Sequence, residues 1–374
     1  DYTGGGCPHI LAEPQRTNLV TYSEDFSQWI ASGSMTVGNS SSVASPSNEN
    51  SVGIMTGTTG TASKFARIDV TTTSQTHTYS AFFKYNTQQF VQFASGGTSE
   101  YANFDIQNGV VGNKLSSVTS TIESFGNGWY RCTLSTSVAS QPSNMAAVLI
   151  DSATSARLSS TSSTNSLYIW GASLEVGSYA TSYIPTSGST VTRNQDIFTR
   201  DGIGSLINST EGVFFLEFAA LEPTASLNNW ITISDGTTNA DNYIAFVFET
   251  VATGGIVARA TVGGVTTAYI STSALDQSIN RKLAFKWKEN DFAFWIDGVE
   301  VGTNVSGSTF PTSTLNKITF SYNDLSNNLI GKVKQLQVYD TSLSDEQLIL
   351  LTGLPNSTYS SYLAMANALN YTIQ

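Results

Sequence analysis

The sequence predicts an all-β protein made of two tandem antiparallel β-sandwich (jelly-roll) domains with a short C-terminal helical segment. Short runs that alternate apolar and polar residues recur at near-regular spacing in both halves, as in residues 79–85 and 283–287. Helical periodicity is almost absent before residue 342. The length of 374 residues exceeds the size at which a single core usually stops growing, so two domains are expected.

The composition limits the classes of partner. Charged residues make up 12% of the chain, about half the usual share, so Ser, Thr, Asn and Gly must cover much of the surface, as in many extracellular β-proteins. The formal net charge of −11 argues against nucleic acid, which requires a dense basic surface. No apolar run approaches the ~20 residues that span a bilayer, so membrane insertion is not expected.

The first domain is predicted over residues 10–197, after an N-terminal approach segment at 1–9 that contains a glycine run and Pro8. Phe26 and Trp29 are expected to pack inward from a helical turn or loop, whereas residues 31–63 favour only loops and edge strands. Asn108-Gly109 predicts a hairpin turn with positive φ at both residues. The expected strands are 65–70, 79–85, 90–93, 101–106, 122–125, 129–134, 145–150 and 167–174.

A linker is predicted at 198–211, and the second domain at 212–353. Its most informative stretch is 282–301, in which two apolar sets of alternating phase are separated by Glu289-Asn290 and followed by Asp297-Gly298. This pattern predicts a three-stranded antiparallel meander. The inward residues of the two sets are Leu283, Phe285, Trp287, Phe292, Phe294 and Ile296. The other expected strands are 213–218, 230–233, 243–248, 255–262, 266–270, 318–322 and 333–339.

A short helix is expected after the last strand. Ser344 and Gln347 have capping-box spacing, and Gly353 with Pro355 would end the helix. Residues 354–374 carry no charge and several aromatic side chains. We therefore expect a C-terminal docking or oligomerisation tail that packs on the second domain or on another subunit.

Several blocks of the first half together resemble a module of tailed-bacteriophage tail and fibre proteins and their prophage relatives. The blocks are Leu11-x-Glu-Pro-Gln-Arg-Thr-Asn-Leu19, Tyr22-Ser-Glu-Asp-Phe-Ser-Gln-Trp29, Gly126-Asn-Gly-Trp-Tyr-Arg-Cys132, Tyr168-Ile-Trp-Gly-Ala-x-Leu-Glu175 and Thr181-Ser-Tyr-Ile-Pro-Thr186. The resemblance implies a carbohydrate-binding-module-like sandwich in a virion appendage, as the C-terminal part of a longer polypeptide, without an assigned sugar. The blocks at 11–19 and 168–193 are expected to be the opening and closing strands of this one domain.

The second half resembles the laminin-G-like or concanavalin-A-like sandwich. The resemblance is carried by Phe294-Trp-Ile-Asp-Gly-Val299, by the stretch Gly331-Lys-Val-Lys-Gln-Leu-Gln-Val-Tyr339 and by Ser342-Leu-Ser-Asp-Glu-Gln-Leu348. In that family a short helix follows the last strand, which agrees with the helix expected from the capping residues.

Catalytic groups are sparse. His9 and His77 lie far apart in sequence and have no recognisable triad partners. Glycosidases on the concanavalin-like fold usually present Glu-x-Asp-x-x-Glu from one strand, but the nearest stretch here, Glu217 to Glu222, lacks the middle acid and has the wrong spacing. Glu217 is expected to be solvated or ion-paired, and the protein is expected not to be an enzyme.

Two further features concern metal binding and thiols. Asp235, Asn239 and Asp241, with Asn242, offer oxygen ligands for calcium, although the same residues are typical of any polar turn. No other cofactor is expected. Cys7 and Cys132 could form a disulfide that closes a long loop, but two free thiols are favoured, with Cys132 as a small buried side chain.

The tryptophans are the candidate sugar platforms. Trp29, Trp129, Trp170 and Trp287 lie in family blocks or apolar phases and are expected in the core. Trp230 and Trp295 are out of phase with their apolar neighbours, so either is a candidate exposed platform, with Lys286 nearby. Burial in the core or at a subunit interface is the alternative for both.

These observations lead to one hypothesis and three rivals. The hypothesis is a non-enzymatic phage tail-fibre or receptor-binding fragment at the extracellular virion surface, which contacts host-surface polysaccharide or other glycans. Its expected partners are other virion proteins and further copies of itself, as a homotrimer by analogy with other fibres. The rivals are a purely structural fibre or capsid-decoration module, a polysaccharide depolymerase, and a secreted bacterial adhesin.

Overall fold

The computed structural model describes residues 9–221, 229–238, 241–250 and 254–353. It confirms the predicted class: the described chain is all-β with antiparallel sheets, two 3-10 turns and one short α-helix. The chain divides into two compact units. The first unit is residues 15–194, and the second combines residues up to Pro14 with those from Gln195 onward.

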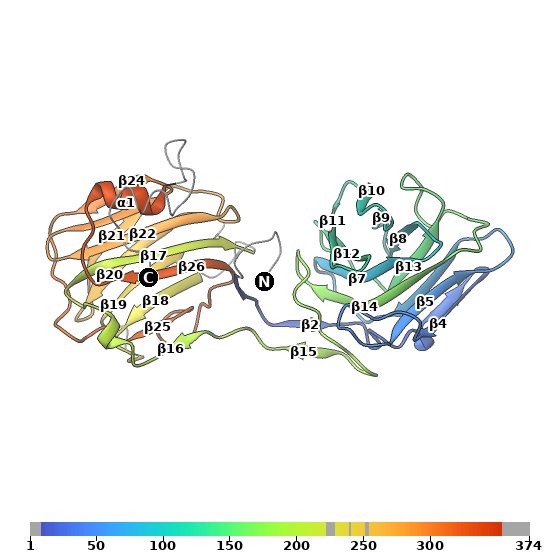
Figure 1. Ribbon diagram of the computed structural model, residues 1–374, viewed down its shortest axis with the longest axis horizontal. Coiled ribbons are helices and arrows are strands. Elements are labelled where there is room, and N and C mark those ends of the chain that lie inside the picture. Colours follow the sequence, from blue (N-terminus) through green and yellow to red (C-terminus); the bar gives the residue numbers. More distant parts are fainter. Residues whose placement is uncertain (1–8, 222–228, 239–240, 251–253, 354–374) are drawn as a thin grey trace. The chain divides into compact units, whose positions relative to one another are not determined.

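The first unit is a sandwich of two six-stranded antiparallel sheets (Figure 1). One sheet has the order β10-β9-β8-β13-β6-β3, and the other has the order β11-β12-β7-β14-β5-β4. The first sheet consists of β3 (Ile30–Ser32), β6 (Lys64–Asp69), β8 (Phe90–Ala94), β9 (Tyr101–Asp105), β10 (Val110–Lys114) and β13 (Asn144–Ile150). The second consists of β4 (Met35–Ser40), β5 (Val52–Gly57), β7 (His77–Tyr85), β11 (Val118–Ser124), β12 (Trp129–Thr136) and β14 (Ser166–Val176).

Alternation along these strands builds the core of the first unit. Phe93 packs between Phe83 and Phe104, with ring centroids 5.4 and 5.6 Å apart, and all three rings are fully buried. Phe26 and Trp29 pack inward from the 3-10 turn η1 (Phe26–Gln28), as predicted. Trp129 and Trp170 are also buried, but in a second apolar cluster outside the main core.

Two local predictions for the first unit were wrong. Residues 31–63 contain more than edge strands, because β5 pairs with both β4 and β14 in the interior of its sheet. The β9–β10 connection is longer than a two-residue turn: it covers residues 106–109, and of Asn108 and Gly109 only Gly109 has positive φ. Asp105 organises this turn by accepting hydrogen bonds from the main chain of Gln107 and Asn108.

The second unit is also a sandwich of two six-stranded antiparallel sheets. The sheet orders are β1-β26-β17-β22-β23-β24 and β16-β25-β18-β19-β20-β21. The first sheet consists of β1 (Ile10–Ala12), β17 (Glu211–Ala220), β22 (Arg281–Lys288), β23 (Phe292–Ile296), β24 (Val299–Asn304) and β26 (Gly331–Tyr339). The second consists of β16 (Thr199–Arg200), β18 (Asn229–Ser234), β19 (Tyr243–Phe248), β20 (Ile256–Val262), β21 (Val265–Ser271) and β25 (Lys317–Thr319).

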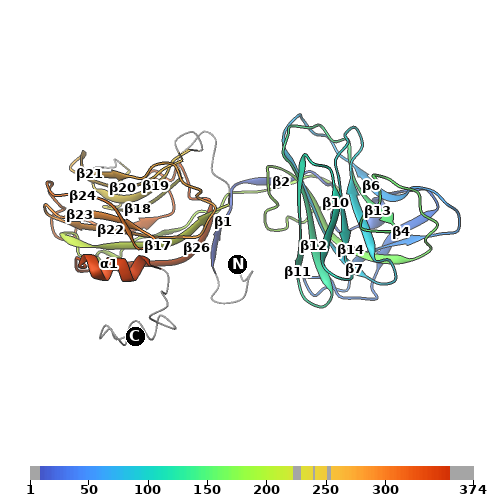
Figure 2. The ribbon, with the colours of Figure 1, turned by 90° about the horizontal axis from the view of Figure 1, so that it is seen from above.

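The meander and the helix are present where the sequence predicted them. Strands β22, β23 and β24 pair in order, and their six predicted inward residues all lie in the main core. Positive φ at Asn290, Asp297 and Gly298 marks the two turns. Helix α1 (Asp345–Thr352) has Ser344 as its N-cap, with both capping-box hydrogen bonds to Gln347. Figure 2 shows α1 on the outer face of the β17–β22–β23 sheet, where Leu348 joins a separate apolar cluster.

The boundary between the units differs from the prediction at Pro14. Strand β1 pairs with β26 of the second unit, whereas β2 (Arg16–Asn18) pairs with β15 (Val191–Arg193) and adjoins β14. The block at 11–19 was predicted as one strand region, but Pro14 ends one strand and a new strand begins two residues later. The predicted linker 198–211 contains β16 and the 3-10 turn η2 (Gly204–Leu206), and its last residue begins β17.

Several predictions fall outside the described residues, namely those for residues 1–8 of the approach segment 1–9, for Cys7 and for the tail 354–374. Cys132 is a buried free thiol in the core of the first unit. No helix in the described part of the chain is long and apolar enough to cross a membrane.

Candidate functional site

Trp295 and Lys286 are not the exposed sugar platform that the sequence suggested. Strand alternation does place Trp295 on the face opposite the main core, but helix α1 covers that face and leaves Trp295 5% exposed. Lys286 lies on the same face, with its Nζ 2.7 Å from Asp291 and 3.8 Å from Asp345. Both residues therefore attach the helix region to the sheet, and the alternative of burial was correct for Trp295.

Trp230 is the half-buried member of the predicted pair. Its ring meets Tyr322 and Tyr243 edge-on, with centroids 4.7 and 6.3 Å away. The Arg259 guanidinium lies over the Tyr243 ring, 5.5 Å from its centroid. The rings of Trp230, Tyr243 and Tyr322 thus pack edge-on against one another. A sugar-binding role for Trp230 stays a prediction.

The predicted calcium ligands form a polar turn. The Asp235 carboxylate accepts hydrogen bonds from the main chain and hydroxyl of Thr237, at 2.9 and 2.8 Å, and from the Asn242 amide at 3.0 Å. The main-chain oxygen of Asp241 accepts from Gly264, and Asn239 lies outside the described residues. Within the described ranges, no group of three His, Cys, Asp or Glu side chains is placed to hold a metal ion.

Glu217 and His77 are both buried rather than solvated. Glu217 is 2% exposed, and its Oε1 lies 3.0 Å from Lys334 Nζ and 2.8 Å from the Asn280 amide. The ion-paired alternative for Glu217 is therefore correct. His77 is fully buried at the start of β7, and burial lowers the pKa of its imidazole.

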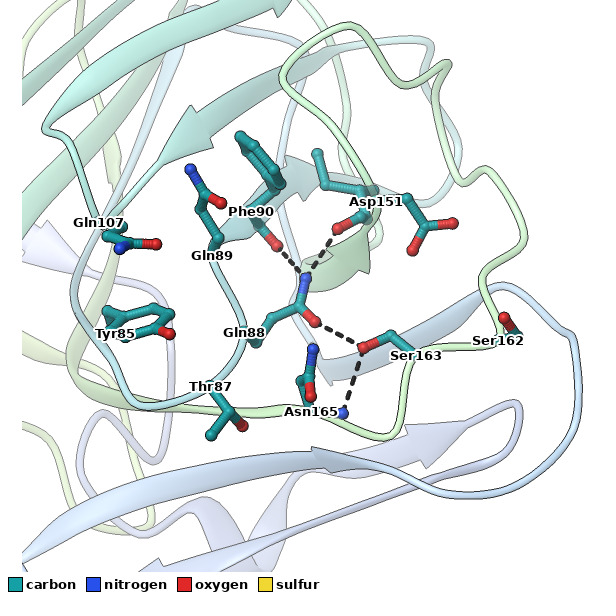
Figure 3. Close-up of a pocket in the computed structure, with 11 residues that line it drawn as sticks. Tyr85, Thr87, Gln88, Gln89, Phe90, Gln107, Asp151, Ser162, Ser163 and Asn165 are labelled. Carbon is teal, nitrogen blue, oxygen red and sulfur yellow. Dashed lines mark hydrogen bonds between the residues drawn. The ribbon is translucent and has the colours of Figure 1, made fainter.

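The structure brings together a different set of polar residues, in the first unit. Five strands meet at one end of this sandwich because neighbouring strands run antiparallel. Three of them, β7, β9 and β13, have their last residues there, and two, β8 and β14, have their first. A cavity of about 360 Å³ opens there, which we call the polar pocket. Its lining residues are Tyr85, Thr87, Gln88, Gln89, Phe90, Gln107, Ile150, Asp151, Ser162, Ser163 and Asn165 (Figure 3).

Gln88 is the structural centre of the polar pocket. Its side chain is 3% exposed, and its amide nitrogen donates to the carbonyl oxygens of Phe90 and Ile150, at 2.8 and 2.7 Å. The Ser163 hydroxyl donates to Gln88 Oε1 at 2.8 Å (Figure 3). These bonds join the start of β8, the end of β13 and the loop before β14, so the buried amide fixes the floor of the pocket and is not available to a ligand.

Other lining groups remain available. The Tyr85 hydroxyl, the Ser162 hydroxyl and the side-chain amides of Gln107 and Asn165 make no hydrogen bond to the rest of the described chain, and all four residues are exposed. The amides and hydroxyls can each donate and accept hydrogen bonds. In Figure 3, Tyr85 and Gln107 stand on one side of Gln88, with Asn165 and Ser162 on the other.

Two walls of the pocket are held from behind. The Thr161 hydroxyl donates to Asp151 Oδ1, and Thr161 is itself fixed by main-chain hydrogen bonds with Ala62. The fully buried Lys64 Nζ donates to the carbonyl oxygens of Ser163, at 2.7 Å, and Thr58, at 2.6 Å. Hydrogen bonds to the rest of the sandwich therefore hold these two pocket walls in place.

The polar pocket contains no tryptophan platform and no pair of acids among its lining residues, so it was not predicted from the sequence. The only local signal is the run Asn86-Thr87-Gln88-Gln89, which is polar and lies between two predicted strands. The remaining lining groups come from residues 107, 150–151 and 162–165, and no spacing rule joins them.

No protein-family model matches the sequence, and no curated protein matches it. Solved structures that resemble it include the CBM40 of the Ruminococcus gnavus IT-sialidase bound to α2,3-sialyllactose, with 16% identity over 42% of this chain and 98% of that chain and a TM-score of 0.35. Sheep galectin-11 in complex with glycerol has 9% identity over 39% of this chain and 98% of that chain, with a TM-score of 0.27.

A third such structure is domain 4 of AbnA, a GH43 extracellular arabinanase from Geobacillus stearothermophilus, in complex with arabinotriose. Its identity is 14% over 44% of this chain and 73% of that chain, with a TM-score of 0.32. These likenesses are confined to β-sandwich architecture and identify no ligand of this chain.

Proposed function

We propose that this chain is a non-enzymatic glycan-binding protein and that the polar pocket of its first unit holds the sugar. The observation that carries the proposal is a set of amide and hydroxyl groups that make no hydrogen bond within the described chain. They surround a pocket whose floor is fixed by the internal hydrogen bonds of Gln88. A pyranose presents hydroxyls that donate and accept, and such groups need partners of the same kind. The exposed Tyr85 ring at the rim offers an apolar surface for the C–H face of the sugar.

Support for binding without hydrolysis comes from the charges of the pocket. Among its lining residues, Asp151 carries the only carboxylate. Glycoside hydrolysis by the usual route needs two carboxyl groups that flank the bond, about 5–9.5 Å apart. A single carboxylate on an open rim fits recognition better than it fits acid–base catalysis.

We further propose the setting that the sequence blocks suggest, a bacteriophage appendage that contacts host-surface polysaccharide. In that setting each pocket would bind weakly, and several copies on one virion would raise the overall avidity. The homotrimer and the attachment to other virion proteins belong to the same proposal.

The test is binding of the full chain to a panel of immobilised glycans and purified bacterial surface polysaccharides. Tyr85→Ala and Asn165→Ala should each weaken binding at least about fivefold, as expected for the loss of one contact of about 1 kcal/mol. Trp230→Ala tests the rival sugar site in the second unit, and it should bind like the wild type if the polar pocket alone holds the sugar. No binding on any surface, or loss of binding only in Trp230→Ala, would contradict the proposal.

The depolymerase rival is tested on the same polysaccharides by measuring reducing ends and unsaturated sugars. We expect no release above the buffer control. Release that Asp151→Asn abolishes would assign the pocket to an enzyme instead.

A further inference from the structure

The polar pocket carries one negative charge and no positive charge. Asp151 is the only charged residue among those that line it. The remaining lining groups are amides, hydroxyls and apolar side chains, as Figure 3 shows for the labelled residues. The charge of the pocket therefore depends on Asp151, and this decides which sugars it can accept, provided that the proposed glycan binding holds.

Asp151 is exposed but held in place. It follows Ile150, the last residue of β13, whose carbonyl oxygen accepts from the buried Gln88 amide. Its Oδ1 accepts from the hydroxyl of Thr161, which is 1% exposed. Its other oxygen, Oδ2, makes no hydrogen bond to the described residues, and Asp151 is one of the residues that line the pocket. A ligand in the pocket thus meets a fixed acceptor with a full negative charge.

The ammonium of Lys64 lies near the pocket but does not line it. Lys64 is 0% exposed, and its Nζ donates to the carbonyl oxygens of Thr58 and Ser163. Because the ammonium lies behind the main chain of Ser163, the wall presents to the pocket a serine side chain and not a cation. A carboxylate on a ligand would consequently find no lysine or arginine to neutralise it within the pocket lining.

We propose that the pocket selects neutral sugars, namely hexoses and N-acetylhexosamines, and rejects sugars that carry a carboxylate, such as sialic and uronic acids. Hydroxyl and acetamido groups can donate to Asp151 Oδ2 and exchange hydrogen bonds with the amides of Gln107 and Asn165. A sugar carboxylate can only accept, so it would repel Asp151 and leave that oxygen without a donor. Like charges a few ångströms apart at a hydrated rim should weaken binding about tenfold or more.

The test uses matched probes on the full chain. Calorimetry compares galactose with galacturonic acid, and glucose with glucuronic acid, so that within each pair only the hydroxymethyl group at C6 is replaced by a carboxylate. The neutral member should bind about tenfold more tightly in each pair that binds. Asp151→Asn, which keeps the Oδ1 acceptor for Thr161, should reduce that preference to about threefold or less. Glu123→Gln, an exposed carboxylate on β11 of the same unit, changes the net charge equally and should leave the preference unchanged.

The outcomes separate the two proposals. Acidic members that bind as tightly as neutral ones, or a preference that Asp151→Asn leaves intact, would overturn the charge selection while glycan binding stands. Absence of binding to every probe and to the wider glycan panel would overturn both. Matching urea midpoints for the two variants and the wild type would show that altered selectivity does not come from altered folding.

Discussion

Replacement of Gln88 by leucine tests whether the floor of the polar pocket is built as described. Leucine has a similar volume but no polar atoms, so Gln88→Leu removes three hydrogen bonds, to Phe90, Ile150 and Ser163. At a net contribution of roughly 0.5–1.5 kcal/mol each, the free energy of unfolding should fall by about 3 kcal/mol. For a unit of this size such a loss lowers the melting temperature by about 6–12 °C.

The assay is urea unfolding of the full chain followed by tryptophan fluorescence, with calorimetry for the melting temperature. Gln107→Leu is the matched control, because Gln107 lines the same pocket but is exposed and has no side-chain hydrogen bond to the described residues. It should change the free energy of unfolding by no more than about 0.5 kcal/mol. Equal effects of the two substitutions would refute the structural role assigned to Gln88.

Three other predictions concern stability. Lys64→Met removes the two hydrogen bonds of a buried ammonium, but it also removes the cost of burying that charge, so the free energy of unfolding should fall by about 1–3 kcal/mol. Glycan affinity should fall with it, and an unchanged urea midpoint would contradict the prediction. Burial lowers the pKa of His77, so the buried imidazole favours the folded state in its neutral form. Its contribution to the free energy of unfolding is fully present above the ordinary histidine pKa of 6.5 and is lost as the pH falls below that value. His77→Gln should flatten the fall in unfolding free energy between pH 7 and 5, and parallel curves would count against this. Ser344→Ala should cost the second unit about 1 kcal/mol by removing the N-cap of α1, whereas no shift in urea would show that the cap is not needed.

The regular part of the fold could be predicted because alternation records burial directly. Leu283, Phe285 and Trp287 share a phase and lie in one core, and the Asp297-Gly298 turn has the positive φ that its residues favour. The capping box at Ser344 was equally local. The pairing of β1 with β26 was not predictable in this way, because three residues carry too little periodicity to choose a partner more than 300 residues away.

The candidate site could not be predicted for two different reasons. Alternation correctly turned Trp295 away from the core, but exposure also depends on what covers the second face of a sheet, and here α1 covers it. The polar pocket depends on loops that meet only because five strands begin or end at one edge of the sandwich. Local residue spacing predicts neither which element covers a sheet face nor which loops meet at one end of a sandwich.

The most direct test of the central claim is a crystal structure of the chain with the best neutral glycan from the binding panel. We expect the sugar to lie in the polar pocket, with hydrogen bonds to Asn165 or Gln107 and its ring against Tyr85. A sugar bound at the Trp230–Tyr322 cluster, with the polar pocket holding only solvent, would contradict the account.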